Sequence, residues 1–231
     1  MRIFKNFIEA HREIERELRH SGVIYQSESY QDKSVKDKDE FLTKELIGYS
    51  FLVRDPQVDG YINELGLDRQ WIDNEFLERI SGLKLNPGDA YKLRNVWDEF
   101  VHDGKFAYTY SERIGNQIID IIKLLTENKS SRHAMIFIYQ PEIDNPRRGG
   151  KIRIPCSIYY NFFIRKEGDT DKLSMIYNIR SNDFGTHFPY DIVLARMLQQ
   201  NIALILEIPA GDLIYQSGSL HVFKKDYEEV F

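Results

Sequence analysis

The chain has 231 residues, of which 42% are hydrophobic and 29% are charged, so it is long enough to bury one substantial core. A single domain over residues 1–231 is therefore expected. The formal net charge of -5 argues against a surface that binds nucleic acid, since such a surface usually carries an excess of Lys and Arg. Small anions remain open as ligands, because a few arginines can bind one phosphate.

Cysteine usage and hydropathy indicate the cellular compartment in which the protein acts. Cys156 is the only cysteine, so no internal disulfide is possible and an oxidising compartment is not indicated. Charges interrupt the apolar residues of the N-terminal stretch, unlike the apolar core of a signal peptide. No window approaches the roughly 20 apolar residues that cross a bilayer. We expect a soluble cytoplasmic protein that binds neither nucleic acid nor a membrane.

The first half of the chain is predicted to be mainly helical. Apolar residues at helical spacing predict an amphipathic helix over residues 4–22. A polar loop over 27–40 and a buried strand over 45–53 follow. A helix over 67–82 has one apolar face, and a helix over 115–128 is apolar around most of its circumference. The second of these helices should therefore be buried on most sides.

The second half is predicted to consist mainly of strands. Runs of β-branched and aromatic residues predict strands over 134–141, 151–168 and 172–182. A helix over 190–206 precedes a last strand over 212–223. Helices and strands that mix without strict alternation indicate an α/β or α+β domain built on one large mixed sheet.

Cys156 follows Pro155 directly, inside an apolar run. A single buried cysteine is usually a small hydrophobic residue, so nucleophilic chemistry needs support from neighbouring polar groups. Arg180, Ser181 and Asp183 follow an apolar strand, where side chains can reach a pocket. A guanidinium there could bind phosphate and, close to sulfur, favour the thiolate. An ordinary surface turn explains the same residues equally well.

Other isolated polar residues carry weaker signals. His221 lies in an apolar strand, where a histidine more often has a structural role. No second His or Cys stands at ligand spacing, so no metal site is predicted. Arg147 and Arg148 are most simply an exposed turn.

Several short motifs occur in a consistent order. They are Pro-Cys at 155–156, Arg-Ser-x-Asp at 180–183 and Gly-x-x-His at 218–221, preceded by Trp-Asp-Glu at 97–99 and a Ser-Arg strand with Arg132. Together they resemble the thymidylate synthase family, especially its deoxycytidylate hydroxymethylase branch, over about residues 36–228. The resemblance implies a thymidylate synthase-like fold, with helices flanking one large mixed sheet and a sheet face used for dimerisation.

The resemblance also implies a role for each matching residue. Cys156 would add to carbon-6 of a pyrimidine, which makes carbon-5 nucleophilic enough to attack a one-carbon donor. The other implied residues are the catalytic Glu75 and Tyr110; the phosphate-binding Arg180, Ser181, Lys38, His133 and, from the partner subunit of a homodimer, Arg132; and the base- or sugar-binding Asp191, His221 and Asp183. For Glu75 the alternative is an exposed carboxylate on a helix.

Asp191 is the residue that the resemblance links to the choice of pyrimidine base. Thymidylate synthases have asparagine at this position, whereas the cytidylate hydroxymethylases have aspartate, which accepts from the exocyclic amine of cytosine. The alternative role for Asp191 is an N-cap of the following helix.

The chain also departs from the family pattern. Phe223 stands where a tyrosine usually contacts the sugar, which admits a ribonucleotide substrate. His133 replaces a second arginine, and the sequence ends soon after the histidine strand, at Phe231.

The resulting prediction is a homodimeric C5 hydroxymethyltransferase that acts on a pyrimidine nucleoside monophosphate, CMP or dCMP, with 5,10-methylenetetrahydrofolate. One alternative is a UMP or dUMP C5-methyltransferase of thymidylate synthase type, with or without flavin assistance. Another is a nucleotide-binding family member without turnover, for which the departures from the family pattern argue.

Overall fold

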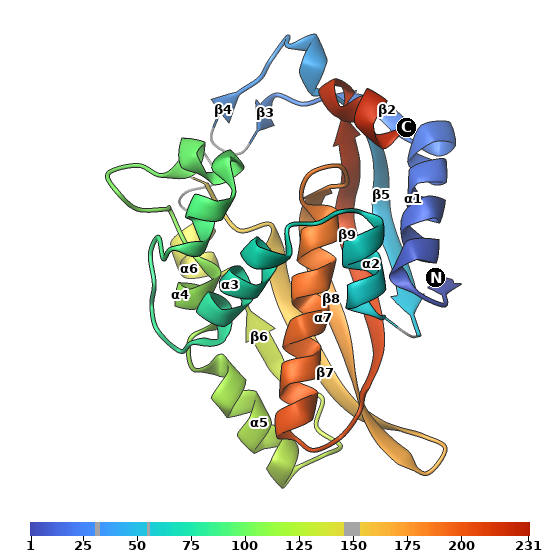
Figure 1. Ribbon diagram of the computed structural model, residues 1–231, viewed down its shortest axis with the longest axis vertical. Helices are drawn as coiled ribbons and strands as arrows, with labels where there is room; N and C mark the ends of the chain where they lie inside the picture. Colours follow the sequence, from blue (N-terminus) through green and yellow to red (C-terminus); the bar gives the residue numbers. More distant parts are fainter. Residues whose placement is uncertain (31–32, 55, 146–152) are drawn as a thin grey trace.

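A mixed β-sheet forms the centre of the fold (Figure 1). The structure, a computed structural model, describes residues 1–30, 33–54, 56–145 and 153–231. In these ranges seven strands join in the order β1-β5-β9-β8-β7-β6, with β2 also paired to β5. They are β1 (Arg2–Phe4), β2 (Val23–Gln26), β5 (Leu42–Val53), β6 (Met135–Phe137), β7 (Ser157–Glu167), β8 (Thr170–Asp183) and β9 (Ala210–Phe223). Because β8 and β9 run parallel, their carboxyl ends meet at the same end of the sheet.

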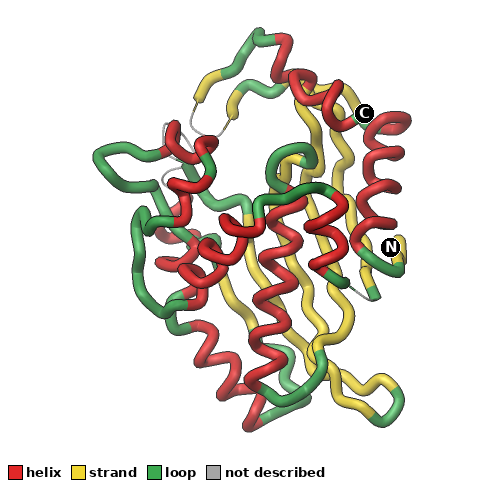
Figure 2. Tube along the Cα trace, in the orientation of Figure 1, coloured by secondary structure: helices red, strands yellow, loops and turns green. Residues whose placement is uncertain are grey.

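Helices pack on one face of this sheet. In Figure 1 and Figure 2, α2, α3 and α7 lie on the viewer's side of the strands, and α1 lies beside β5. The helices are α1 (Phe7–Ser21), α2 (Val58–Glu64), α3 (Arg69–Ile80), α4 (Tyr110–Ile114), α5 (Gln117–Glu127), α6 (Pro141–Asp144), α7 (Phe188–Ile205) and α8 (Tyr227–Val230). A small ribbon of β3 (Ser29–Tyr30) and β4 (Lys33–Ser34) stands apart from the main sheet.

Alternation of side chains explains the layered arrangement. In β8, Leu173, Met175, Tyr177 and Ile179 are buried, and successive residues of a strand point to opposite faces. The face that carries these residues therefore holds the core beneath α7, whose own side chains are buried along its length. Between them, Ile176 is only half-buried, on the opposite face.

Most predicted elements are confirmed. The N-terminal helix ends at Ser21, as expected, but begins only at Phe7, because the Asn6 side chain caps it by accepting from Glu9 N at 2.9 Å. Phe4 belongs instead to β1. The loop predicted over 27–40 contains the short β3–β4 ribbon and one 3-10 turn, Asp39–Phe41.

Two predictions about local structure are wrong. The helix α5 is not buried on most sides: Ile118, Ile121 and Leu125 are buried, but Ile119 is 65% exposed, since only one side of α5 packs against β6 and α7. Cys156 does not lie within a strand but in a bend immediately before β7.

The predicted exposed turn at Arg147 and Arg148 lies outside the described residues. Within the described ranges, no helix has the length and apolar character that a bilayer crossing requires.

Candidate active site

Cys156 stands at the wall of an open pocket. The pocket has a volume of about 300 Å³, and the thiol is half-buried in it rather than enclosed by apolar side chains. Directly after it, the buried Ser157 hydroxyl lies 2.7 Å from Tyr110 Oη and 2.7 Å from Tyr177 Oη. This chain of hydroxyls fixes the start of β7, and with it the position of the sulfur.

Arg180 connects β8 to the thiol. Its backbone N–H donates to Cys156 O at 2.8 Å, and its Nε donates to Pro155 O at 2.9 Å. The guanidinium Nη2 lies 3.5 Å from Cys156 Sγ. The guanidinium and the sulfur are therefore neighbours.

The carboxyl ends of β8 and β9 form another wall of the thiol pocket. Ser181 pairs with Ser219 and Asp183 with His221 in the parallel register, so the four side chains reach the same pocket. The strand continues through Asp183, so the sequence Ser-Asn-Asp is not the predicted turn. Burial, followed by the nearby Asp226 carboxylate, raises the pKa of Asp183 to about 6.

Asp191 also reaches this pocket, from the first turn of α7. The N-cap of that helix is His187, whose carbonyl accepts from Asp191 N at 2.9 Å, so the predicted alternative of Asp191 as N-cap is wrong. Burial raises the pKa of Asp191 to about 6, although Arg79 and Arg94 favour its charged form. Within the described ranges its carboxylate has no hydrogen-bond partner, which leaves it available to a ligand.

Glu75 forms an ion pair with Arg79, one turn further along α3. The two side chains are 19% and 8% exposed, and Arg79 Nε donates to Glu75 Oε1 at 2.7 Å. The guanidinium carbon of Arg79 lies 3.7 Å from the centroid of the Tyr110 ring. Glu75 is therefore not the exposed helix carboxylate of the alternative interpretation. Arg79 was missed in the sequence, although its spacing of four residues from Glu75 was the available signal.

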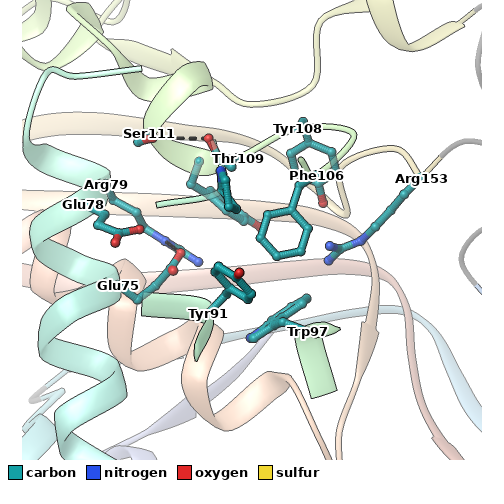
Figure 3. Close-up of a pocket in the computed structure, with 12 residues that line it drawn as sticks. Glu75, Glu78, Arg79, Tyr91, Trp97, Phe106, Tyr108, Thr109, Ser111 and Arg153 are labelled. Atoms are coloured by element: carbon teal, nitrogen blue, oxygen red, sulfur yellow. Dashed lines mark hydrogen bonds and ion pairs between the residues drawn. The ribbon is translucent and has the colours of Figure 1, made fainter. Parts of the chain in front are cut away.

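A smaller aromatic pocket of about 60 Å³ adjoins the first (Figure 3). Tyr91, Trp97, Phe106 and Tyr108 line it, and Glu75 and Arg79 face it from α3 (Figure 3). The guanidinium carbon of Arg153 lies 4.8 Å from the Trp97 ring and 5.3 Å from that of Tyr108. Arg79, Trp97, Tyr108, Tyr110 and Arg153 line both pockets, so the two spaces share a wall.

Glu78, which also lines the smaller pocket, has a structural role. Glu78 Oε1 accepts from Asp89 N at 2.6 Å and from Ala90 N at 2.8 Å. Gly88 has a φ of +78°, and a Cβ there would lie 2.2 Å from Glu78 Oε2. Only glycine allows this approach, which holds the segment carrying Tyr91 against α3.

Two buried donors in the wall of the larger pocket are unsatisfied. Trp71 Nε1 and Arg94 Nη1 have no hydrogen-bond partner among the described residues. Buried donors are rarely left unpaired in native proteins, so these atoms are suited to an acceptor group on a ligand. The sequence offered no signal for either residue.

Three predicted phosphate-binding residues do not reach the pocket of their own chain. Arg132 and His133 are exposed in the loop before β6. Lys38 lies at a separate surface, beside Asp39 and Lys224. The structure therefore leaves Arg180 and Ser181 as the predicted phosphate residues that line the pocket.

An accessible cysteine thiol next to a guanidinium, at the carboxyl ends of two parallel strands, is the class of site that suits covalent catalysis on an anionic ligand. Residues 62–231 match the thymidylate synthase family. The chain belongs to this family of one-carbon transferases, whose members generally use methylenetetrahydrofolate.

Individual relatives agree with this membership. The chain is 28% identical over 194 residues to a putative thymidylate synthase of Methanococcoides burtonii, covering 81% of this chain and 77% of that protein. It is 24% identical over 171 residues to the thymidylate synthase of Francisella tularensis, covering 67% of this chain and 60% of that protein. The fold matches thermostable thymidylate synthase A from Bacillus subtilis with a TM-score of 0.75 and 17% identity, over 97% and 82% of the two chains. The predicted thymidylate synthase-like fold is confirmed.

Proposed function

We propose that this protein is a C5 hydroxymethyltransferase for cytidylate. The observation that carries the proposal is the Asp191 carboxylate, which faces the same pocket as the Cys156 thiol and has no hydrogen-bond partner in the described part of the chain. A carboxyl group accepts from the exocyclic amine of cytosine, and its protonated form also donates to ring nitrogen-3. Uracil has an oxygen at the position of that amine, so an ionised carboxylate repels it.

The thiol provides the first step of the reaction. The sulfur of Cys156 forms a bond to carbon-6, and the electron pair of the 5,6 double bond becomes available at carbon-5. Arg180 and Ser181 bind the phosphate, so that the ring is held beside the sulfur. Carbon-5 then forms the new carbon–carbon bond and loses its proton. The carbon–nitrogen bond to the one-carbon donor would break as its amine leaves, water would add to the resulting exocyclic methylene and lose a proton, and departure of the thiolate from carbon-6 would restore the 5,6 double bond.

Glu75 is suited to orient that water. Glu75 lines the smaller pocket, and its ion pair with Arg79, which lines both pockets, keeps the carboxylate beside the shared wall, where it can accept a proton from water as oxygen adds to the exocyclic carbon. Tyr110, which stacks on Arg79, supports this arrangement.

The aromatic pocket fits the family's cofactor in its chemistry. The flat faces of Tyr91, Trp97, Phe106 and Tyr108 suit a heteroaromatic ring system next to the thiol pocket. When bound, methylenetetrahydrofolate supplies a one-carbon unit at the oxidation level of formaldehyde. Flavin belongs only to the alternative function.

Incubation with each of CMP, dCMP, UMP and dUMP tests the proposal. With methylenetetrahydrofolate present, we expect a hydroxymethylated cytidylate by mass spectrometry, and tritium at carbon-5 of the cytidylate should pass into water. A methylated uridylate, together with exchange only from UMP or dUMP, would instead support the alternative for which the names of the relatives argue. Tight nucleotide binding without any exchange would support the family member without turnover.

A homodimer completes the proposed site. The sheet face opposite the helices carries half-buried apolar residues such as Ile176 and Ile214, which suits contact with a second copy. Arg132 and His133 would then reach the phosphate of the partner. We also expect the protein to act in the cytoplasm.

Mixing two inactive variants tests the shared site. In a mixture of Cys156→Ala and Arg132→Ala subunits, each heterodimer holds one site with both residues intact. Activity should therefore return to about a quarter of the wild-type value after subunit exchange, because half of the dimers are mixed and each has one active site of two. In a control mixture of Cys156→Ala with Arg165→Ala, whose substituted arginine is exposed, activity should stay at about half of the wild-type value before and after exchange. A monomer in sedimentation, or no recovery on mixing, would remove Arg132 from the site.

A further inference from the structure

Glu45, Ser219 and His221 form a hydrogen-bonded chain on one wall of the thiol pocket. Glu45 on β5 and His221 on β9 are direct partners in the antiparallel register, so both side chains stand on the same face of the sheet. The Ser219 hydroxyl donates to Glu45 Oε1 and lies 3.1 Å from His221 Nδ1.

This chain determines which nitrogen of His221 carries the proton. A serine hydroxyl has one hydrogen, and that of Ser219 is donated to Glu45, so towards Nδ1 the serine can only accept. Nδ1 must then be protonated, and Nε2 of the neutral ring is an acceptor. Burial, with a contribution from Arg180, lowers the pKa of His221 to about 4, which keeps the ring neutral at pH 7.

The same wall therefore presents two acceptors. Nε2 of His221 is one, and the Glu45 carboxylate is the other, since within the described residues only Ser219 donates to the Glu45 side chain. The centroid of the Phe223 ring lies 5.0 Å from that of the His221 ring, and the centroid of the Tyr30 ring lies 5.5 Å from that of the Phe223 ring. These rings make this end of the pocket aromatic. Two acceptors in an aromatic enclosure suit a ligand with two hydroxyl donors.

From the position of this wall we infer that the site recognises the vicinal 2′- and 3′-hydroxyls of ribose, so that the substrate is a ribonucleotide, CMP rather than dCMP. The inference rests on the proposed function, because it takes the ligand to be a nucleotide held at Arg180 and Ser181. Deoxyribose has one hydroxyl fewer, and its binding would leave one acceptor desolvated and unpaired. Phe223 cannot compensate, because it has no polar atom.

Affinities of the unchanged protein for CMP, 2′-deoxy-CMP and 3′-deoxy-CMP test this inference without any question of folding. By isothermal titration calorimetry, CMP should bind ~10- to 100-fold more tightly than either deoxy form, the range expected for one unpaired buried acceptor. Equal affinities for CMP and 2′-deoxy-CMP would overturn the inference.

A variant then assigns the effect to Glu45. In Glu45→Ala, the preference for CMP over 2′-deoxy-CMP should fall to within about threefold, while the affinity for 2′-deoxy-CMP changes little. Glu40→Ala, an exposed glutamate outside this pocket, is the matched control and should keep the preference. An equal loss of affinity for both nucleotides in Glu45→Ala would overturn the role of Glu45.

The uridine pair separates this inference from the proposed function. A preference for UMP over dUMP, with no preference for cytosine, would support ribose recognition while the cytidylate assignment fails. A preference for cytosine without any preference for ribose would support the cytidylate assignment while ribose recognition fails.

Discussion

Replacing Cys156 by alanine is expected to abolish exchange of the carbon-5 hydrogen, with a loss of about four orders of magnitude or more in rate. The chain has no second thiol, and the described residues that line the pocket include no other group that can add to carbon-6 in its place. Nucleotide affinity should stay within about tenfold of the wild-type value, because Arg180 and Ser181 bind the phosphate independently of the sulfur. Tritium release measures the exchange, and calorimetry measures the affinity.

Cys156→Ser is the matched variant for this experiment. The hydroxyl has the shape of the thiol but stays protonated near neutral pH, so this variant should be as inactive as alanine. Exchange at more than about 1% of the wild-type rate in both variants would exclude the covalent mechanism.

Replacing Asp191 by asparagine is expected to shift base preference from cytosine to uracil. The amide of asparagine donates to the carbonyl oxygen of uracil and accepts from its N3–H, whereas the ionised carboxylate only accepts. The ratio of kcat/KM for CMP to that for UMP should fall by about 100-fold or more, since a mismatched base leaves buried polar groups unpaired. Asp120→Asn, at an exposed position of α5, is the control. An unchanged ratio would remove Asp191 from base recognition.

The same residue predicts a dependence on pH. Burial raises the pKa of Asp191 to about 6, so its carboxyl group is largely protonated below that pH and ionised above it. The protonated form can pair with both bases, because it donates to cytosine nitrogen-3 or to the uracil oxygen, whereas the ionised form repels that oxygen. The CMP-to-UMP affinity ratio should therefore rise from pH 5.5 to pH 8. Using a ratio cancels the titration of the nucleotide phosphate, which is common to both ligands. Asp191→Asn should abolish the dependence, whereas a ratio independent of pH in the wild type would contradict it.

The sequence allowed the thiol, the guanidinium and the carboxylate of this site to be predicted, because each belongs to a short motif. Cys156, Arg180 and Asp191 do line one pocket. The strands were also predictable, since the alternation in β8 reflects one buried face of the sheet.

The missed residues depend on contacts between distant segments. Glu45 faces His221 only through the β5–β9 register, and no local pattern reveals such pairing. Arg153 meets Trp97 across a separation of 56 positions in the sequence. The exposed side of α5 was misjudged for a related reason, because apolar composition does not reveal how many neighbours a helix has.

The hydroxyl chain behind the thiol has a consequence for the speed of the reaction. Ser157 and Tyr177 hold the bend at Cys156 from the core side, where both are buried, and Tyr110 joins them from the pocket wall. The sulfur thus loses its conformational entropy once, when the polypeptide folds. That entropic cost does not recur in each turnover, so the free energy of nucleotide binding is available to position the pyrimidine ring.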